Sequence, residues 1–284
     1  MGRAQVRLGK TELFLLSDGV WALDGGAAFG IVPKVLWQQV ASCDDKNRVP
    51  MALNCLLIIS EGKRILVDTG YGTKLSLKEE QQFALKRSGS GLLDAIQAIG
   101  LAPDDVDIVI NTHLHSDHCG GNTVLQSGVP VPAFPRAEYW VQRQEWADAR
   151  YPNERASSAY QPANFAVLEQ SRCLRLLCGD ERVTSEVRCM VTRGHTRAHQ
   201  SVVIESEGET AIFLGDVASR AVLLERLKWS SAFDVEPFEM VESKRALRAW
   251  ACERHALLLF GHGIDLPMGR LRQDGDRFLV EGAA

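Results

Sequence analysis

The stretch NTHLHSDHCGGN, residues 111–122, places three histidines and an aspartate within six positions and follows them with two glycines. It comes directly after VDIVI (106–110), an apolar run typical of a buried strand. The polar side chains therefore stand where a strand ends and the chain turns. His113 and His115 are two positions apart, so an extended backbone can direct both rings to one side. Imidazole and carboxylate groups at this density indicate a metal site.

Further metal-binding residue types follow three other apolar strands, and each stands beside a glycine. His195 follows VRCMVT, Asp216 follows AIFL, and His262 follows ALLLF. One such case is weak evidence, whereas several that meet at the carboxyl ends of strands can form one site. We therefore expect these three residues to join the 113–118 cluster, where together they offer enough ligands for two adjacent divalent cations.

Two segments repeat one plan: an apolar run, a Ser-Glu-Gly turn, a second apolar run and an aspartate at its end. These segments are CLLIISEGKRILVDTG (55–70) and SVVIESEGETAIFLGD (201–216). Each predicts a β-hairpin. The doubling predicts a single domain over 1–284 that is built from two similar halves, roughly 1–180 and 181–284. Any two buried hairpins look alike at this level of detail, so a chance likeness stays open.

Helices are expected between the strands. Apolar residues recur at helical spacing over 91–101, and amphipathic helices are also predicted over 135–150 and 242–255. The segment 151–165, YPNERASSAYQPANF, is the most loop-like interior stretch, of the kind that often forms a lid or a binding loop. Strands that alternate with helices without a regular period predict a layered α/β protein.

Composition and charge argue against several partners and locations. The formal net charge of −4 disfavours nucleic acid as a main partner, because phosphate binding needs a basic surface. No apolar run approaches the roughly 20 residues that a membrane span needs, so we expect no membrane association. The seven cysteines include no C-x-x-C pair, which argues against a disulfide framework and predicts a reduced, cytoplasmic location.

In the order H-x-H-x-D-H (113–118), Gly-His195, Gly-Asp216 and Gly-His262, these motifs resemble those of the metallo-β-lactamase-fold hydrolases. The resemblance runs from the strand near residue 53 to about residue 263. It implies an α/β fold, an αββα sandwich of two mixed β-sheets flanked by helices, with two metal ions at one edge.

The resemblance also implies roles for particular residues. It assigns His113, His115 and His195 to the first metal, Asp117, His118 and His262 to the second, Asp216 to a bridge between them, and Asp68 to orienting a ligand histidine rather than binding metal. The metals it implies are two divalent ions, zinc first, with iron, cobalt or manganese as alternatives.

A narrower resemblance rests on DGGAAFGIVPKVLW (24–37), on the THLHSDHCGG stretch and on EWADARYPN (145–153). These segments are similar to those of quorum-quenching N-acyl-homoserine lactonases and of methyl parathion hydrolases. Two positions depart from the pattern. Arg197 replaces a proline of the G-H-T-P-G-H motif, and Ser219 stands where some lactonases carry a tyrosine that assists at the substrate carbonyl.

The expected reaction is metal-dependent hydrolysis that opens the ring of an N-acyl homoserine lactone. Two divalent ions that share a water lower its pKa towards about 7, so that metal-bound hydroxide attacks the carbonyl carbon. Asp117 is the expected catalytic residue, a ligand that relays a proton to the leaving oxygen. The substrate pocket is expected to be lined by five apolar residues, each of which could instead be core: Phe29, Ile31, Trp37, Trp140 and Trp146.

Other functions stay open. The same site could hydrolyse organophosphate triesters, or act as a broad esterase or β-lactam hydrolase. From other classes, a di-iron oxidoreductase on this scaffold and a non-catalytic metal-binding module also remain. The expected partner is a small-molecule lactone or ester, and a homodimer is not decided by the sequence.

Overall fold

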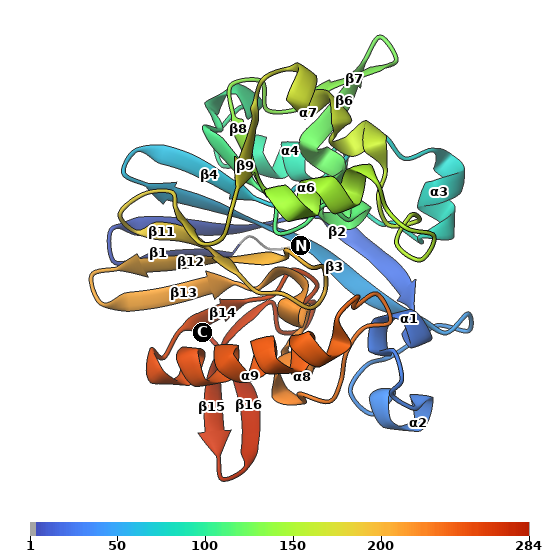
Figure 1. Ribbon diagram of the computed structural model, residues 1–284, viewed down its shortest axis with the longest axis vertical. Coiled ribbons are helices and arrows are strands. Elements are labelled where there is room, and N and C mark those ends of the chain that lie inside the picture. The colour runs from blue at the N-terminus through green and yellow to red at the C-terminus, as the bar shows by residue number, and fades with distance from the viewer. Residues whose placement is uncertain (1–3, 284) are drawn as a thin grey trace.

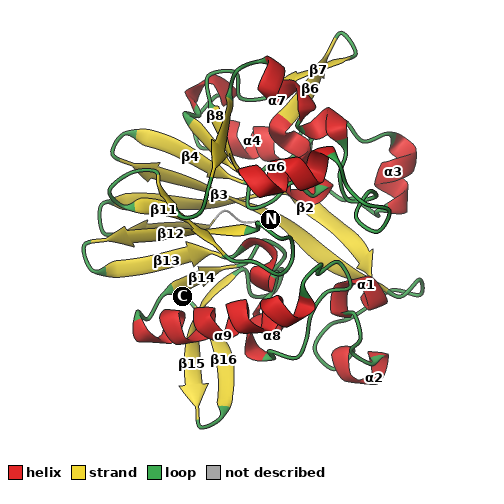
Figure 2. Cartoon of the chain, in the orientation of Figure 1, coloured by secondary structure: helices red, strands yellow, loops and turns green. Residues whose placement is uncertain are grey.

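Two seven-stranded sheets pack face to face in the computed structural model, which describes residues 4–283. Helices cover the outer face of each sheet, so that the layers run helix, sheet, sheet, helix (Figures 1 and 2). This confirms the αββα sandwich that the sequence predicts. Residues 1–3 and 284 of the predicted domain lie outside the described residues.

The first sheet is formed by residues 4–177. Its strands, in spatial order, are β1 (Ala4–Leu8), β2 (Thr11–Asp24), β3 (Arg48–Ser60), β4 (Lys63–Val67), β5 (Ile108–Ile110), β8 (Glu138–Gln142) and β9 (Leu174–Leu177). Strands β1 to β4 are joined antiparallel, whereas β4, β5, β8 and β9 run parallel, so the sheet is mixed.

The second sheet is formed by residues 181–282 and is also mixed. Its strands, in spatial order, are β10 (Glu181–Arg182), β11 (Val187–Val191), β12 (Gln200–Ser206), β13 (Glu209–Phe213), β14 (Leu257–Leu259), β15 (Met268–Asp274) and β16 (Arg277–Gly282). Only β13 and β14 pair parallel. A separate two-stranded ribbon joins β6 (Thr123–Gln126) to β7 (Val129–Pro132).

The helices are short except for the last. The α-helices are α1 (Gly25–Phe29), α2 (Lys34–Trp37), α3 (Leu77–Gln82), α4 (Leu92–Gln97), α5 (Ser116–Cys119), α6 (Arg143–Arg150), α7 (Ala166–Gln170), α8 (Ala221–Glu225) and α9 (Pro237–Glu253). The 3-10 turns are η1 (Pro103–Asp105), η2 (Gly120–Asn122), η3 (Pro162–Asn164) and η4 (Gly215–Ala218). Within residues 4–283, none of the helices has the length and apolar content that crossing a membrane requires.

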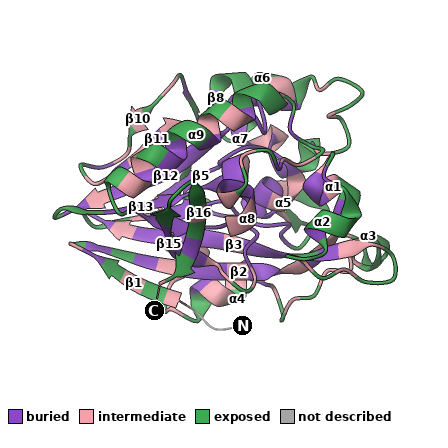
Figure 3. Cartoon of the chain, turned by 90° about the horizontal axis from the view of Figure 1, so that it is seen from below, coloured by how far each residue is buried: buried purple, intermediate pink, exposed green. Residues whose placement is uncertain are grey.

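The main core lies between the two sheets. Ile58 and Ile110 of the first sheet belong to the same buried cluster as Val202 and Phe213 of the second. Two further clusters lie under the helices, one with α4, α6 and α7 on the first sheet and one with α9 on the second. Central strands are therefore buried on both faces, which is why their sequences are continuous apolar runs (Figure 3).

Most predicted elements are confirmed, and one is partly wrong. Both predicted hairpins form, as β3–β4 and β12–β13. Helices α4 and α9 lie where helices were expected. The segment predicted as a helix over 135–150 instead contains strand β8, and only α6 is helical. Tyr139, Trp140 and Val141 favour an extended strand, and burial on both faces stabilises it there.

The strands that precede the metal-binding residues point the same way within each sheet. In the first sheet β4 and β5 are parallel. In the second, β11 runs in the direction of β13 and β14, because β11 and β13 are both antiparallel to β12. The loops that follow these strands therefore open at one edge of each sheet.

Candidate metal centre

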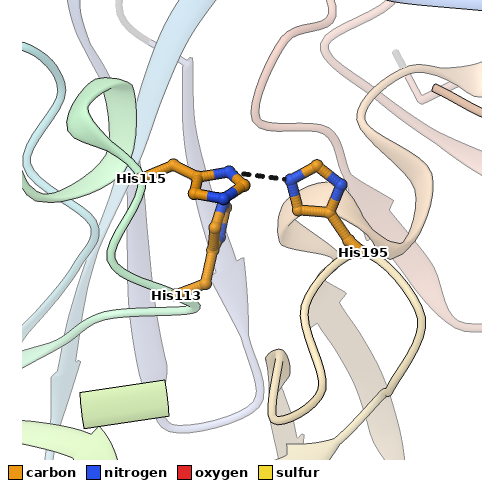
Figure 4. Close-up of side chains that lie close together, drawn as sticks. All are labelled: His113, His115 and His195. Atoms are coloured by element: carbon orange, nitrogen blue, oxygen red, sulfur yellow. Dashed lines mark hydrogen bonds between the residues drawn. The ribbon is translucent and has the colours of Figure 1, made fainter. Parts of the chain in front are cut away.

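The loops at this edge bring all seven predicted ligand residues together. Three groups of side chains each place one potential ligand atom per residue within 4.8 Å of the others. These groups are His113–His115–His195, His113–His118–Asp216 and Asp117–His118–His262. In the first group, His115 Nδ1 lies 3.1 Å from His195 Nε2, with the ring of His113 beside them (Figure 4).

Asp216 lies between the histidines of the two halves. Its Oδ2 is 3.4 Å from His195 Nε2, and its Oδ1 is 3.3 Å from His262 Nε2 and 3.5 Å from His118 Nε2. The backbone N–H of Asp216 donates to His199 Nε2 at 2.9 Å, so a fourth buried ring fixes the turn that carries the carboxylate. A carboxylate in this position can share its two oxygens between two cations.

Asp68 fixes the orientation of His118. Its carboxylate accepts a hydrogen bond from His118 Nδ1 at 2.8 Å, which directs Nε2 towards Asp117 and Asp216. Asp68 is held in turn by the backbone N–H and the hydroxyl of Thr112, both at 2.8 Å. The backbone of Asp68 has φ 58°, a conformation that costs a non-glycine residue energy and that these hydrogen bonds maintain.

Two more ligand histidines have their outer nitrogen engaged. His113 Nδ1 is 3.0 Å from the hydroxyl oxygen of Thr112, and His262 Nδ1 donates to the carbonyl of Ala52 at 2.6 Å. Because the Thr112 hydroxyl donates to Asp68, it accepts from His113. Each ring therefore directs Nδ1 to an acceptor outside the cluster and Nε2 to its centre, the orientation in which a deprotonated Nε2 can bind a cation.

Sequence reasoning missed two acidic residues that support the centre. Asp234, in the loop before α9, accepts a hydrogen bond from His195 Nδ1 at 2.8 Å. Glu145 on α6 accepts from the backbone N–H of Leu114 at 2.9 Å and from the hydroxyl of Tyr160 at 3.1 Å. Glu145 begins the segment EWADARYPN, on which the narrower resemblance rests, but the sequence did not show that it contacts the metal loop. Asp234 belongs to no local motif.

Two buried polar atoms in the cluster have no hydrogen-bond partner. They are His113 Nε2 and Asp216 Oδ1, one from each sheet, and both point into the cluster. A buried acceptor without a partner is costly, so it marks a place where a ligand is expected. The chemistry of the donor set, imidazole nitrogens and carboxylate oxygens, fits a divalent cation such as zinc.

The protonation states also suit cation binding. Burial and the imidazoles of His118 and His115 hold the pKa of His113 well below its usual range, and burial with the charge of His195 lowers that of His115 to about 3. Both rings are therefore neutral at pH 7, the form that coordinates metal. Burial alone would raise the pKa of Asp216, but the imidazole of His262, followed by that of His118, outweighs it and holds the pKa well below its usual range.

The carboxylates of Asp117 and Asp216 stabilise positive charge on the neighbouring histidines. Burial alone would lower the pKa of His262, yet Asp216 and Asp117 raise it to about 9. Burial would likewise lower the pKa of His118, and the charges of Asp117 and Asp216 raise it well above its usual value. A divalent cation beside these carboxylates would supply the positive charge without any proton. The residues present therefore fit a metal centre.

A cavity of about 440 Å³ opens onto the cluster. Asp117, His115, Asp216 and His262 form its polar end. One wall is an aromatic group in which Tyr71 stacks on Phe83 at 5.2 Å between ring centroids, and Trp21 meets both edge-on. The cavity thus places an apolar wall directly beside the candidate metal ligands.

The five residues expected to line the pocket do not lie on this cavity. Phe29 and Trp37 are buried and stack on each other at 5.2 Å, and Ile31 is 91% exposed on the surface. Trp140 lies in the core between the sheets, and Trp146 on the buried side of α6 packs against Phe165. The expectation is corrected accordingly: the aromatic wall comes from β2, from the loop after β4 and from the end of α3.

The two departures from the lactonase motifs have clear structural positions. Arg197 is exposed and forms an ion pair with Asp148 of α6, away from the cavity. Ser219 lines the cavity, and its carbonyl accepts a hydrogen bond from the backbone N–H of His262 at 2.9 Å. The cavity instead has a phenol on another wall, that of Tyr71.

Comparison with known proteins defines the class. The family model of the metallo-beta-lactamase superfamily matches residues 48–262, and the chain therefore belongs to this superfamily. An N-acyl homoserine lactonase from Bacillus cereus is 26% identical over 234 residues, which cover 78% of this chain and 86% of the relative. The identification made from the sequence is thus confirmed at the level of the superfamily and of its curated relatives.

Solved structures agree with this assignment. A probable metal-dependent hydrolase from Staphylococcus aureus superposes with a TM-score of 0.88 and 26% identity, over 98% of this chain and 100% of that one. AidC, a dizinc quorum-quenching lactonase solved in complex with a product, gives a TM-score of 0.80 at 21% identity, over 100% of this chain and 98% of that one. At that identity AidC supports the fold alone.

Proposed function

We propose that this protein is a metal-dependent hydrolase that opens the lactone ring of N-acyl homoserine lactones. One observation carries the proposal: Asp216 faces His195 with one oxygen and His118 and His262 with the other, at the polar end of a cavity with an aromatic wall. The names of the curated relatives support the same substrate class.

Two divalent cations, zinc by preference, are the proposed cofactors. His113, His115 and His195 would hold one, Asp117, His118 and His262 the other, and Asp216 would contact both. Iron, cobalt and manganese accept the same donor atoms. Bound divalent cations would supply two kinds of chemistry, a water of lowered pKa and a polarised carbonyl oxygen.

Asp117 is the residue we propose for proton transfer. Its carboxylate faces the cavity, and its Oδ2 lies 3.3 Å from His262 Nε2. Burial alone would raise the pKa of Asp117, but the charges of His118 and His262 lower it to about 2. It is therefore ionised at neutral pH, ready to accept a proton from the attacking water and to pass it to the leaving alkoxide.

Tyr71 offers a second polar group to the substrate. Burial and the charge of Asp117 raise the pKa of the Tyr71 phenol well above its usual value, so it keeps its proton at neutral pH. A protonated phenol on the cavity wall can donate a hydrogen bond to a substrate oxygen. We propose that Tyr71 supplies the phenol that position 219, a serine in this chain, lacks.

The aromatic wall would take the acyl chain. Trp21, Tyr71 and Phe83 present a continuous apolar surface that begins beside His262, whose ring centroid is 6.3 Å from that of Trp21. Burying an alkyl chain contributes about 0.8 kcal/mol per methylene. An N-acyl chain that leads away from the ring would find this surface next to the reacting carbonyl.

We further propose that the chain forms one domain in the cytoplasm. A buried cluster that includes residues of both sheets supports one domain. All seven cysteines are free, which suits a reducing compartment.

The sandwich leaves Ile31 and Phe238 exposed at 91% and 90%, and a homodimer would cover such residues.

A panel of substrates tests the proposed function. Purified protein loaded with Zn²⁺ would be assayed by pH-stat with N-hexanoyl homoserine lactone, phenyl acetate, paraoxon and a β-lactam. We expect the highest kcat/KM on the lactone, by at least about tenfold, with every activity absent from Asp216→Asn. Hydrolysis of paraoxon without opening of the lactone would refute the proposed substrate and favour a phosphotriesterase.

A further inference from the structure

The loop between α8 and α9, residues 226–236, contributes a side chain to the metal centre that the mechanism above does not use. Asp234 accepts a hydrogen bond from His195 Nδ1 at 2.8 Å, and the two residues are only 4% and 2% exposed. With its proton on Nδ1, His195 has its lone pair on Nε2. That atom lies 3.1 Å from His115 Nδ1 and 3.4 Å from Asp216 Oδ2, inside the cluster.

The backbone fixes Asp234 to the segment that carries its partner. The N–H of Val235 donates to the carbonyl of His195 at 3.2 Å, and the N–H of Glu236 donates to the carbonyl of Gly194 at 2.9 Å. Two backbone hydrogen bonds thus join the two residues after Asp234 to Gly194 and His195. The distance between the carboxylate and the ring is therefore set by backbone structure on both sides.

The second carboxylate oxygen is engaged as well. Asp234 Oδ2 accepts from the backbone N–H of Ser231 at 3.0 Å, and the Ser231 hydroxyl donates to the carbonyl of Ala27 at 3.0 Å. Below the loop, the buried ammonium group of Lys244 donates to the carbonyl of Trp229. The carboxylate cannot turn away from His195 without breaking the hydrogen bond from Ser231 N–H, and the other two contacts hold the loop that carries both residues.

The arrangement repeats in the other half of the protein. Asp68 accepts from His118 Nδ1 at 2.8 Å, as Asp234 does from His195 Nδ1 at 2.8 Å. His118 and His195 belong to different groups of ligand atoms, so each group has one histidine that an external carboxylate holds. Asp68 directly follows a strand, whereas Asp234 comes from a loop far along the chain.

We propose that Asp234 is a positioning residue that keeps the proton of His195 on Nδ1 and thereby sets how tightly the His113–His115–His195 group binds a divalent cation. The inference rests on the cation sites of the proposed function and is independent of the substrate. Loss of a carboxylate that holds a ligand histidine typically weakens metal binding by about 10–100-fold. An asparagine keeps the shape of Asp234, but the backbone N–H of Ser231 needs an acceptor, so the amide oxygen would face Ser231 and the amide NH2 would face His195 Nδ1. That donor would move the ring proton to Nε2 and block coordination.

Titration with Co²⁺ measures the effect, because its visible absorption reports coordination directly. Chelator-treated wild type, Asp234→Asn and Asp68→Asn would be titrated, with Asp148→Asn as a matched control on the surface ion pair with Arg197. We expect Asp234→Asn to lower the affinity for one of the two bound Co²⁺ ions by about 10–100-fold and to leave the affinity for the other within about twofold. Asp68→Asn should lower the affinity for the other ion. Asp148→Asn should change neither affinity.

Two results would overturn the proposal: wild-type affinity for both ions in Asp234→Asn, or an equal loss at both ions in a variant that still unfolds cooperatively. If Asp234→Asn loses affinity for one ion only and the wild type opens no lactone, the inference is supported and only the proposed substrate is refuted. If Asp234→Asn binds both ions like the wild type and the wild type opens lactones, the inference is refuted and the proposed substrate stands.

A measurement on the wild type keeps the proposal testable even if Asp234→Asn does not fold. Nitrogen-15 spectra of the Zn²⁺-loaded protein report which ring nitrogen of His195 carries the proton. We expect a proton on Nδ1, shifted far downfield by its bond to the carboxylate. A proton on Nε2, or an Nδ1 proton that exchanges freely with water, would contradict the proposal.

Discussion

His118 Nε2 and His262 Nε2 lie 3.1 Å apart, although one residue follows a strand of the first sheet and the other a strand of the second. The cluster therefore exists only where the two halves of the sandwich meet. A cation held by both rings would also join the two sheets. The same is true of Asp216 and His113, which come from different sheets.

Cation binding should therefore stabilise the whole fold. At a free Zn²⁺ concentration about 1,000 times Kd, a ligand that binds only the folded state adds about 4 kcal/mol. For a chain of this size that corresponds to a rise in Tm of roughly 8 °C. Calorimetry of chelator-treated and Zn²⁺-loaded protein checks this, with His262→Ala as the variant expected to lose much of the gain. An identical Tm in both states would contradict a site shared by the sheets.

Removing part of the aromatic wall should change the preference for chain length. Phe83→Ala deletes a ring that stacks on Tyr71 and should raise KM for long-chain N-acyl homoserine lactones by about tenfold, because a phenyl contact contributes about 1.5–3 kcal/mol. The KM for a butanoyl substrate should stay within about twofold. Steady-state kinetics over a chain-length series measures this.

Ile31→Ala is the matched control for that series, since Ile31 is 91% exposed and lies off the cavity. It should leave both KM values unchanged. If Ile31→Ala altered chain-length preference and Phe83→Ala did not, the acyl chain would not bind along the aromatic wall.

Asp18 should make stability fall as pH rises. Burial raises the pKa of Asp18 from 3.8 to about 6, against the opposing effect of its hydrogen bond from Leu92 N. Because the pKa is higher in the folded state, the contribution of the protonated Asp18 to folding stability is fully present below about pH 4 and is lost as pH rises through about 6. The ionised carboxylate then costs roughly 2–3 kcal/mol.

Denaturant unfolding of wild type and Asp18→Asn between pH 4 and pH 7 tests this prediction. The asparagine cannot ionise, so the difference in free energy of unfolding between wild type and Asp18→Asn should narrow or reverse as pH rises. A difference that stays constant over this range would show that Asp18 titrates alike in the folded and unfolded chain.

Arg197 should matter little in spite of its unusual place in the histidine motif. Its ion pair with Asp148 is at the surface, and such pairs contribute about 0–1 kcal/mol. Arg197→Ala should keep lactone kcat/KM within about twofold and change the free energy of unfolding by less than about 1 kcal/mol. A tenfold loss of activity would show that the residue acts on the site in a way its position does not suggest.

The fold and the metal cluster could be predicted because their signals are local. H-x-H-x-D-H follows a strand within a few residues, and the hairpins show their turns at Gly62 and Gly208. Strand β8 is harder to predict, because EYWVQ continues directly into the helix RQEWADAR and the combined segment has the pattern of one amphipathic helix. Nothing in the local sequence marks that boundary.

The cavity wall and Asp234 could not be predicted for a different reason. Phe29 and Trp37 are as aromatic as Trp21 and Phe83, and only tertiary packing decides that the first pair is core and the second lines the cavity. Asp234 stands in a loop without a motif, and its partner His195 is 39 residues away. Contacts over such separations depend on how the elements pack.

Metal-dependent lactone opening is tested most directly by the activity of chelator-treated protein as Zn²⁺ is added back, for wild type and for Asp216→Asn. We expect lactone opening by the wild type to rise until two equivalents are bound. Asp216→Asn should remain folded and lose more than about 100-fold in kcat/KM, beyond what the loss of a merely orienting residue costs. Full turnover by Asp216→Asn, or by wild type without any divalent cation, would contradict the account.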